Sequence, residues 1–117
     1  MSISKGFSRS IRLTKPSEYS SIFAFKRLVR VPHFSVFAKP NQSIGRLGIA
    51  ISKRVASRSV DRNYMKRVIR EIFRLNKTGF IGFDWVVQAR TKFHNGSYDS
   101  IQEELLNAVR QMCARKN

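Results

Sequence analysis

The chain has 117 residues, 42% of them hydrophobic and 11% aromatic, which is enough for one domain with a sizeable core and too apolar for a disordered tail. Its 23 Lys and Arg against 7 Asp and Glu give a formal net charge of +16, which indicates a polyanionic partner, nucleic acid before an anionic membrane surface. The single cysteine excludes an internal disulfide and a cysteine-based zinc site, and the absence of an apolar run of membrane-spanning length predicts a cytoplasmic protein.

The first third of the chain predicts an arm, a helix and a strand. Residues 1–13 are basic and lack apolar periodicity, so we expect a flexible arm on a single domain spanning 1–117. Pro16 suits the first turn of a helix, which we place at about 16–27. Residues 31–39 alternate and are rich in Val and Phe, which predicts a strand. Its two faces carry Phe34, Val36 and Ala38 on one side and His33, Ser35 and Phe37 on the other.

A second strand is predicted at 46–52, after a turn made by Pro40, Asn41 and Ser43. Its inward face carries Leu47, Ile49 and Ile51, and its other face carries only the small residues Gly48, Ala50 and Ser52, which leaves room above the sheet. A basic loop follows, then a long helix from about 59 to 77 that ends near Gly79. A strand at 84–90, a turn at Asn95-Gly96 and a helix from 98 to about 115 complete an α+β sandwich with one sheet and about three helices.

The predicted helix at 59–77 has one cationic face. Residues 53–77 hold nine of the basic side chains, and Asp61 and Glu71 are the only acids available to pair with them. An ordinary solvent-exposed helix face carries both acidic and basic side chains. Like charges four residues apart repel one another, so the excess of cations on this face favours binding to a polyanion. Val60, Tyr64, Met65, Val68, Ile72 and Leu75 are predicted to occupy the opposite half. The predicted RNA-binding residues are Lys53, Arg54, Arg58, Arg62, Asn63, Lys66, Arg67, Arg70 and Arg74.

The stretch SVDRNYMKRVIREIFR, which follows GIAISKRV, resembles the signature of the bacterial ribonuclease P protein family. That signature reads as a strand ending in Ser-Lys-Lys/Arg, followed by Arg-Asn-Arg-x-x-Lys/Arg-Arg-x-x-Arg. The resemblance extends over about residues 12–112 and is kept at Arg62, Asn63, Lys66, Arg67 and Arg70. Tyr64 stands where the family usually has Arg, and Ala56 and Ser57 stand where it has glycines.

The resemblance implies an accessory subunit of the endoribonuclease that matures tRNA 5′ ends. In that family a large RNA subunit hydrolyses the phosphodiester with Mg²⁺, and the protein, which is expected to bind no cofactor, adds positive charge and contacts the 5′ leader of precursor tRNA. We therefore expect one protein bound to one RNA subunit, with no further protein required. The resemblance also implies a left-handed connection between the two strands that flank the signature helix, against the usual right-handed rule.

Aromatic residues near the N-terminus allow two interpretations. An aromatic pair one turn apart, such as Tyr19 and Phe23, is usually core. In the resembled family, aromatics at these positions line a shallow cleft for the leader, where stacking tolerates many base sequences. The leader-binding residues that this implies are Arg12, Tyr19, Phe23, Phe37 and Ser52.

The sequence predicts no catalytic or metal-binding residue. The seven acids are scattered, and His33 and His94 lie on different elements without an evident acidic partner. A ribosomal-type structural RNA-binding protein is the second hypothesis. A DNA-binding regulator is the third, although the chain lacks the short helix pair that it would need.

Overall fold

The computed structural model describes residues 12, 13, 15–40, 45–94 and 96–115. Most of the predicted arm, with Asn41, Ser43 and Asn95 of the predicted turns, lies outside these residues. The elements are α1 (Pro16–Phe25), β1 (Leu28–Arg30), β2 (Phe34–Pro40), β3 (Arg46–Ala50), α2 (Ser59–Leu75), the 3₁₀ helix η2 (Lys77–Phe80), β4 (Phe83–Ala89) and α3 (Tyr98–Arg115).

Every predicted helix and strand is present with its ends shifted by a few residues, and one strand was missed. That strand, β1, has three residues and only Val29 is buried, so it carries no alternation that a sequence pattern could reveal. The prediction that α2 ends at a capping Gly79 was wrong. The Asn76 side chain donates from Nδ2 to the Ile72 carbonyl oxygen at 2.8 Å, and the chain passes there into η2.

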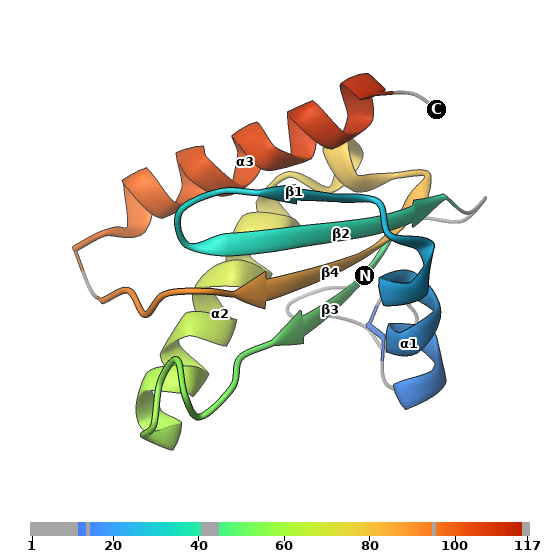
Figure 1. Ribbon diagram of the computed structural model, residues 1–117. Helices are drawn as coiled ribbons and strands as arrows, with labels where there is room; N and C mark the ends of the chain where they lie inside the picture. The colour runs from blue at the N-terminus through green and yellow to red at the C-terminus, as the bar shows by residue number, and fades with distance from the viewer. Residues whose placement is uncertain (1–11, 14, 41–44, 95, 116–117) are drawn as a thin grey trace, which may run out of the picture.

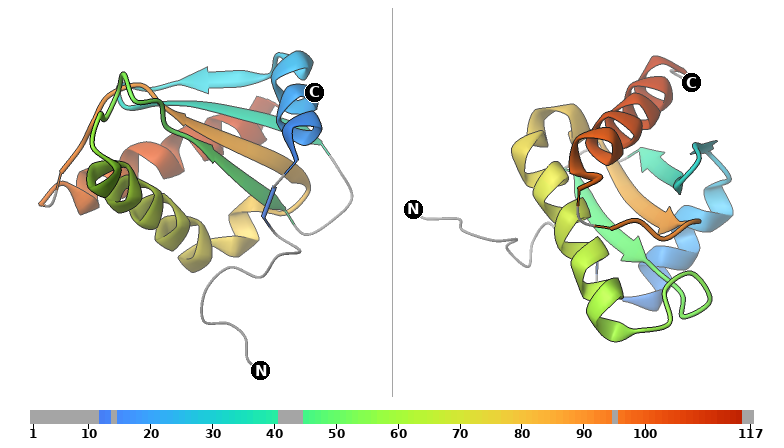
Figure 2. Two further views of the ribbon diagram at one scale, coloured as in Figure 1. Left: turned by 90° about the horizontal axis from the view of Figure 1, so that it is seen from below. Right: turned by 90° about the vertical axis from the view of Figure 1, so that its left-hand side faces the viewer.

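The four strands form one mixed sheet in the order β1-β2-β4-β3. β2 pairs antiparallel with both β1 and β4, whereas β3 pairs parallel with β4. Two helices, α2 and α3, cover one face of the sheet, and α1 lies on the other (Figures 1 and 2). In Figure 1, β3 and β4 both run to the left, α2 lies behind them and β4 lies above β3, so the β3–α2–β4 connection is left-handed. The expected α+β architecture is confirmed.

The main core lies between the sheet and the α2–α3 layer. β2 contributes Phe34, Val36 and Ala38, all fully buried, as its alternation predicted. Trp85 of β4 is also fully buried, and its indole Nε1 donates to the Phe80 carbonyl oxygen at 2.9 Å. The remaining large buried side chains come mainly from the two helices: Met65, Ile69, Ile72, Ile101, Leu105 and Met112.

The core face of α2 differs in part from the predicted one. Met65, Val68 and Ile72 are buried as expected, but Val60 and Leu75 are 63% and 55% exposed. Both lie in the terminal turns of α2, and the helix extends past the sheet at its N-terminal end (Figure 1). Ile69 and Phe73 complete the buried stripe instead.

A small second cluster holds α1 against the opposite face of the sheet. Leu13, Ile22 and Val86 are buried there, and Tyr19, Phe23 and Phe37 pack around them. Ile22 is the one residue of α1 that is fully buried, so apolar packing alone fixes this ten-residue helix weakly.

An ionic cluster ties α1 to two strands. The Arg46 guanidinium donates from Nε and Nη2 to the two carboxylate oxygens of Asp84, at 3.0 and 2.9 Å, and from Nη1 to Glu18 Oε2 at 2.9 Å. The hydrogen bonds to Asp84, and then those to Glu18, raise the pKa of Arg46 above its usual range. Because Glu18 belongs to α1, Arg46 joins this helix to β3 and β4.

Replacing Arg46 should destabilise the protein measurably. Arg46→Met removes the cation on which the partly buried Asp84 and Glu18 carboxylates converge, and we expect the free energy of unfolding to fall by about 1–3 kcal/mol. Urea denaturation checks this. The control Arg110→Met changes an exposed arginine of α3 and should cost less than about 0.5 kcal/mol. Equal losses for both variants would contradict a specific role for the cluster.

Candidate nucleic-acid interface

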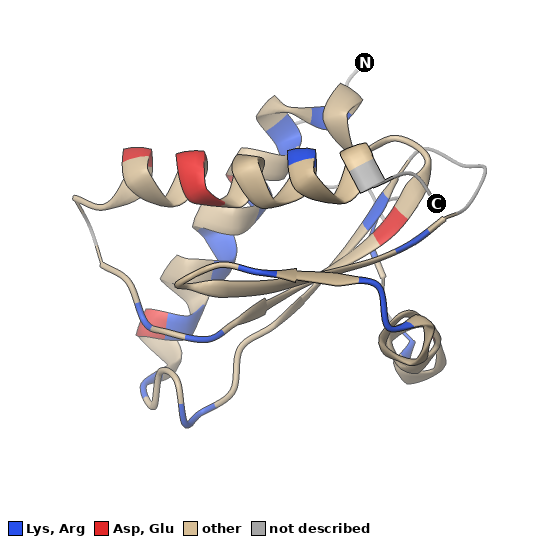
Figure 3. Ribbon diagram, turned by 45° about the horizontal axis from the view of Figure 1, so that its top comes forward, with Lys and Arg blue, Asp and Glu red and all other residues tan. Residues whose placement is uncertain are grey.

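The predicted RNA-binding residues belong to α2 and to the turn before it, where Figure 3 shows several blue Lys and Arg positions. Lys53 and Arg54 are exposed in that turn, and Arg58 is the N-cap residue of α2. Along the helix, Asn63, Arg67 and Arg74 are exposed, whereas Arg62, Lys66 and Arg70 are half-buried. Three of the seven acids lie on α3 (Figure 3), and two, Asp61 and Glu71, lie on α2 itself. We call the surface formed by the predicted RNA-binding residues the basic face.

Acidic side chains compensate two cations of the basic face, Arg58 and Arg74, at the two ends of α2. Asp61 accepts from Arg58 Nε and from Lys92 Nζ, each at 3.0 Å, and these contacts lower the pKa of Asp61. At the other end, Arg74 Nη2 lies 2.6 Å from Glu71 Oε2, and this hydrogen bond lowers the pKa of Glu71.

The middle of the basic face keeps its charge. Among the described residues, Lys66, Arg67 and Arg70 have no acidic partner within ion-pair distance. Arg62 donates from Nη1 to the carbonyl oxygens of Ala56 and Ser57, both at 3.0 Å, and so fixes the turn before α2 while remaining positively charged. The cations left for an external anion thus lie in the central turns of the helix and, with Lys53 and Arg54, in the turn before it.

A pocket of about 200 Å³ joins the basic face to the aromatic side of the sheet. Lys66 and Arg70 line it from α2, Arg12 from the N-terminal segment and Tyr19 from α1. The N-terminal segment is held there because the Leu13 amide donates to the Leu47 carbonyl oxygen at 2.9 Å. Three cations around one opening suit a phosphate group. This adjacency could not be predicted from the sequence, because four separate segments, with β3 as the fourth, form the pocket.

The aromatic cluster, defined as Tyr19, Phe23 and Phe37, is part core and part surface. The rings of Phe23 and Phe37 meet edge to face with centroids 4.8 Å apart. Tyr19 lies over Gly48, where an added Cβ atom would come within 2.6 Å of its ring, so the predicted room above the small residues of β3 is filled here by Tyr19. All three rings are half-buried and keep some surface for a ligand.

Ser52, the last predicted leader residue, is exposed in the turn after β3. Its hydroxyl oxygen accepts from the Val55 amide at 3.3 Å.

Tyr64, which replaces the family's usual Arg, is half-buried on the flank of α2. Its hydroxyl donates to the His94 carbonyl oxygen at 3.4 Å. Tyr64 thus packs beside Phe93 and adds no charge to the basic face.

His33 is a correction to the sequence-based prediction, because it does have an acidic partner. Its Nδ1 lies 2.8 Å from Glu104 Oε1, and its backbone amide donates to the other oxygen of the same carboxylate. The pair joins the segment before β2 to α3, across 71 positions of sequence, which is why no local pattern showed it. Within the described residues, no three His, Cys, Asp or Glu side chains are placed to hold a metal ion.

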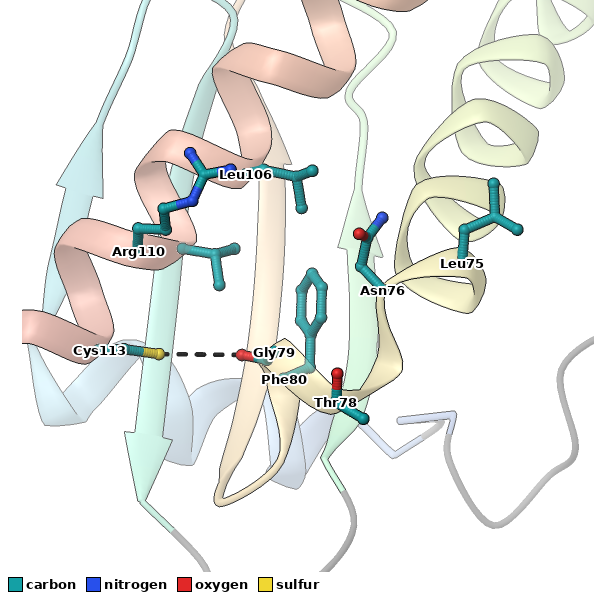
Figure 4. A pocket seen from close by; sticks show the side chains of 9 residues that line it. Leu75, Asn76, Thr78, Gly79, Phe80, Leu106, Arg110 and Cys113 are labelled. Atoms are coloured by element: carbon teal, nitrogen blue, oxygen red, sulfur yellow. Dashed lines mark hydrogen bonds between the residues drawn. The ribbon is translucent and has the colours of Figure 1, made fainter.

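A separate pocket of about 380 Å³ lies between the end of α2, η2 and α3 (Figure 4). Leu75, Phe80 and Leu106 form much of its wall, and Cys113 lies at one end with Sγ 3.8 Å from the Gly79 carbonyl oxygen. Burial raises the pKa of the Cys113 thiol, which keeps it protonated and a poor nucleophile. This pocket offers no acid–base pair.

No helix in the described part of the chain is both long and apolar enough to cross a membrane.

Comparison with known proteins identifies one family. The model of the family described as Ribonuclease P matches residues 7–113. The ribonuclease P protein component of Chromobacterium violaceum is 47% identical over 88 residues, which are 74% of this chain and 73% of the relative. That of Burkholderia mallei is 36% identical, over 93% of this chain and 80% of the relative.

Solved structures agree with this result. The RNase P protein of Staphylococcus aureus superposes with a TM-score of 0.77 at 29% identity, over 86% of this chain and 94% of that one. The RNase P protein of Thermotoga maritima gives a TM-score of 0.77 at 31% identity, over 86% of this chain and 96% of that one. The signature helix, the mixed sheet and these matches together show that the chain belongs to the bacterial ribonuclease P protein family.

Proposed function

We propose that this chain binds the catalytic RNA of ribonuclease P through its basic face and the 5′ leader of precursor tRNA through its aromatic cluster. Cleavage itself would be carried out by the RNA with Mg²⁺, in a cytoplasmic particle of one protein and one RNA that needs no other protein. The observation that carries the proposal is the set of uncompensated cations in the middle of α2, Lys66, Arg67 and Arg70.

Several features support an accessory rather than a catalytic role. Glu18 and Asp84 bind Arg46, Asp61 binds Arg58 and Lys92, Glu71 binds Arg74, and Glu104 binds His33. Five of the seven acids are therefore engaged at separate places in the fold, and the other two, Asp99 and Glu103, lie on α3. A protein nuclease needs carboxylates or histidines that converge on one phosphate. Positive charge on the protein, by contrast, lowers the repulsion between the phosphate groups of two RNA molecules and so favours their association.

The pocket lined by Arg12, Lys66 and Arg70 supports a continuous path for RNA. A strand whose bases stack on the aromatic cluster would carry its backbone towards these three cations, because Tyr19 belongs to both the cluster and the pocket wall. Stacking is worth about 1–3 kcal/mol per base and depends little on sequence, which suits a subunit that meets many leaders.

The direct test measures cleavage of a precursor tRNA by a bacterial ribonuclease P RNA at low Mg²⁺, with and without this protein. We expect the protein to stimulate cleavage and the protein alone to leave the substrate intact, even with Mg²⁺. Cleavage by RNA-free protein would refute the accessory role. Binding of structured RNA without stimulation would instead favour a structural RNA-binding protein.

Removing cations from the middle of α2 should flatten the salt dependence of RNA-subunit binding. For Lys66→Ala and Arg70→Ala, each lost phosphate contact should remove roughly 0.7–0.9 from the slope of log affinity against log salt concentration. Filter binding across a salt series measures this slope. Arg110→Ala, which removes the same charge from α3, is the control and should leave the slope unchanged; slopes that fall equally would indicate a non-specific charge effect.

Removing one aromatic ring should weaken binding only of substrates that have a leader. Phe23→Ala should cost about 1–3 kcal/mol of affinity for precursor tRNA if one base stacks on the ring. Phe25→Ala on the same helix is the control, because Phe25 is 46% exposed and lies outside the aromatic cluster. Affinity for leaderless tRNA should stay constant in both variants, and a matching loss there would indicate a packing defect instead.

A further inference from the structure

A pocket of about 390 Å³ lies on the flank of α2 that faces the segment after β4. Residues of α2 and of that segment line it: Val60, Asp61, Tyr64, Arg67, Phe93 and His94. We call it the flank pocket. Pockets of roughly 300–1,000 Å³ hold small ligands, so the flank pocket suits one small planar group rather than a helix or a strand of another protein.

Tyr64 gives the flank pocket a fixed aromatic wall. Its hydroxyl donates to the His94 carbonyl oxygen at 3.4 Å, and its ring meets the buried Phe93 ring edge to face with centroids 6.2 Å apart. The ring is only half-buried and lines the pocket, so part of its surface is open to a ligand. A ring that is already held in place loses little conformational entropy when a second ring stacks on it.

An apolar and a cationic side chain flank this ring on the helix surface. Val60, Tyr64 and Arg67 are spaced four and then three residues apart, so they are neighbours along one strip of α2. Val60 is 63% exposed, the highest value for a large apolar side chain in the described part of the chain. An apolar edge, a ring and a guanidinium in one strip match the base and the phosphate of a single nucleotide.

The charge around the flank pocket is positive although an acid lines it. Asp61 is that acid, and its carboxylate is bound by Arg58 Nε and Lys92 Nζ, each at 3.0 Å. Two cations therefore surround one carboxylate. Arg67 is exposed, has no acidic partner among the described residues and belongs to both the pocket wall and the basic face. The flank pocket is thus continuous with the surface proposed to bind the catalytic RNA.

The position of the flank pocket favours the catalytic RNA over the leader. The aromatic cluster proposed for the leader packs with α1 on one face of the sheet, whereas α2 covers the other face. In a duplex, neighbouring base pairs cover both faces of a base, so only an unpaired base can reach Tyr64. A metal ion would need more than the one carboxylate among the lining residues.

We propose that the flank pocket receives one unpaired base of the catalytic RNA, stacked on Tyr64, while Arg67 holds the adjoining phosphate. This inference rests on the proposed function of the basic face and deepens it. The cations of that face bind the RNA backbone whatever its sequence, whereas contact with a base distinguishes one site from others on the same RNA.

The test measures binding of the full-length protein to a bacterial ribonuclease P RNA and probes the RNA bases chemically in the complex. Dimethyl sulfate reacts with unpaired adenine and cytosine, and a carbodiimide reacts with unpaired guanine and uracil, so sequencing identifies each base that the protein protects. Wild type is compared with Tyr64→Leu, which removes the ring but keeps an apolar side chain, and with Tyr64→Phe, which keeps the ring.

Two further variants separate the pocket from the stability of the fold. Tyr98→Leu, the same change at a half-buried tyrosine of α3 that also packs against the core, is the matched control. Val60→Ala changes an exposed side chain, so it tests the pocket without disturbing the core. Thermal unfolding is recorded for every variant.

We expect Tyr64→Leu to weaken RNA-subunit binding by roughly 5- to 150-fold, the value of one stacked base, without changing the slope of log affinity against log salt concentration. Val60→Ala should weaken binding by roughly two- to fivefold. One unpaired base that wild type, Tyr64→Phe and Tyr98→Leu protect should become reactive with Tyr64→Leu.

Wild-type affinity and protection in Tyr64→Leu and Val60→Ala, or an equal loss in Tyr98→Leu, would overturn the inference. A reduced salt slope for Tyr64→Leu would also overturn it, because such a change indicates a lost phosphate contact. In each of these cases stimulation of cleavage by wild type would still uphold the proposed function. Absence of stimulation would remove both.

Discussion

Burial of one side of α2 makes it possible for the other side to concentrate like charges. Repulsion between cations one turn apart costs a few tenths of a kcal/mol per pair, whereas each large apolar side chain buried from water contributes about 1.5–3 kcal/mol. Met65, Ile69 and Ile72 are fully buried, so packing outweighs repulsion several-fold. The helix therefore stays folded without compensating its central cations from within the chain, and those cations remain available to an external anion.

The ends of α2 show how this charge is confined. Asp61 engages Arg58 and Lys92, and Glu71 engages Arg74, so the acids of the helix bind at its first and last turns. Arg62 donates hydrogen bonds to backbone carbonyl oxygens rather than to an acid. As a result, Arg62 ties the turn before α2 to the start of the helix, next to the uncompensated cations.

Local pattern was enough to predict the elements but not their partners. The alternation of 31–39 predicted which side chains of β2 face the core, and the spacing of Lys66 and Arg70 predicted one charged face, because both depend only on the geometry of a single element. The three-residue β1 has no period to detect. The Arg46 cluster, the His33–Glu104 pair and the pocket beside Tyr19 each need residues from distant segments, and nothing in one segment indicates the other.

The contact between Tyr19 and Gly48 links two positions that are 29 residues apart. Since even a methyl group at position 48 would meet the Tyr19 ring, the size of one side chain limits the size of the other. Related chains should therefore change these two positions together, a larger residue on the strand accompanying a smaller one on the helix. Such paired substitution would reshape the surface between α1 and β3 while leaving the charge of the molecule untouched.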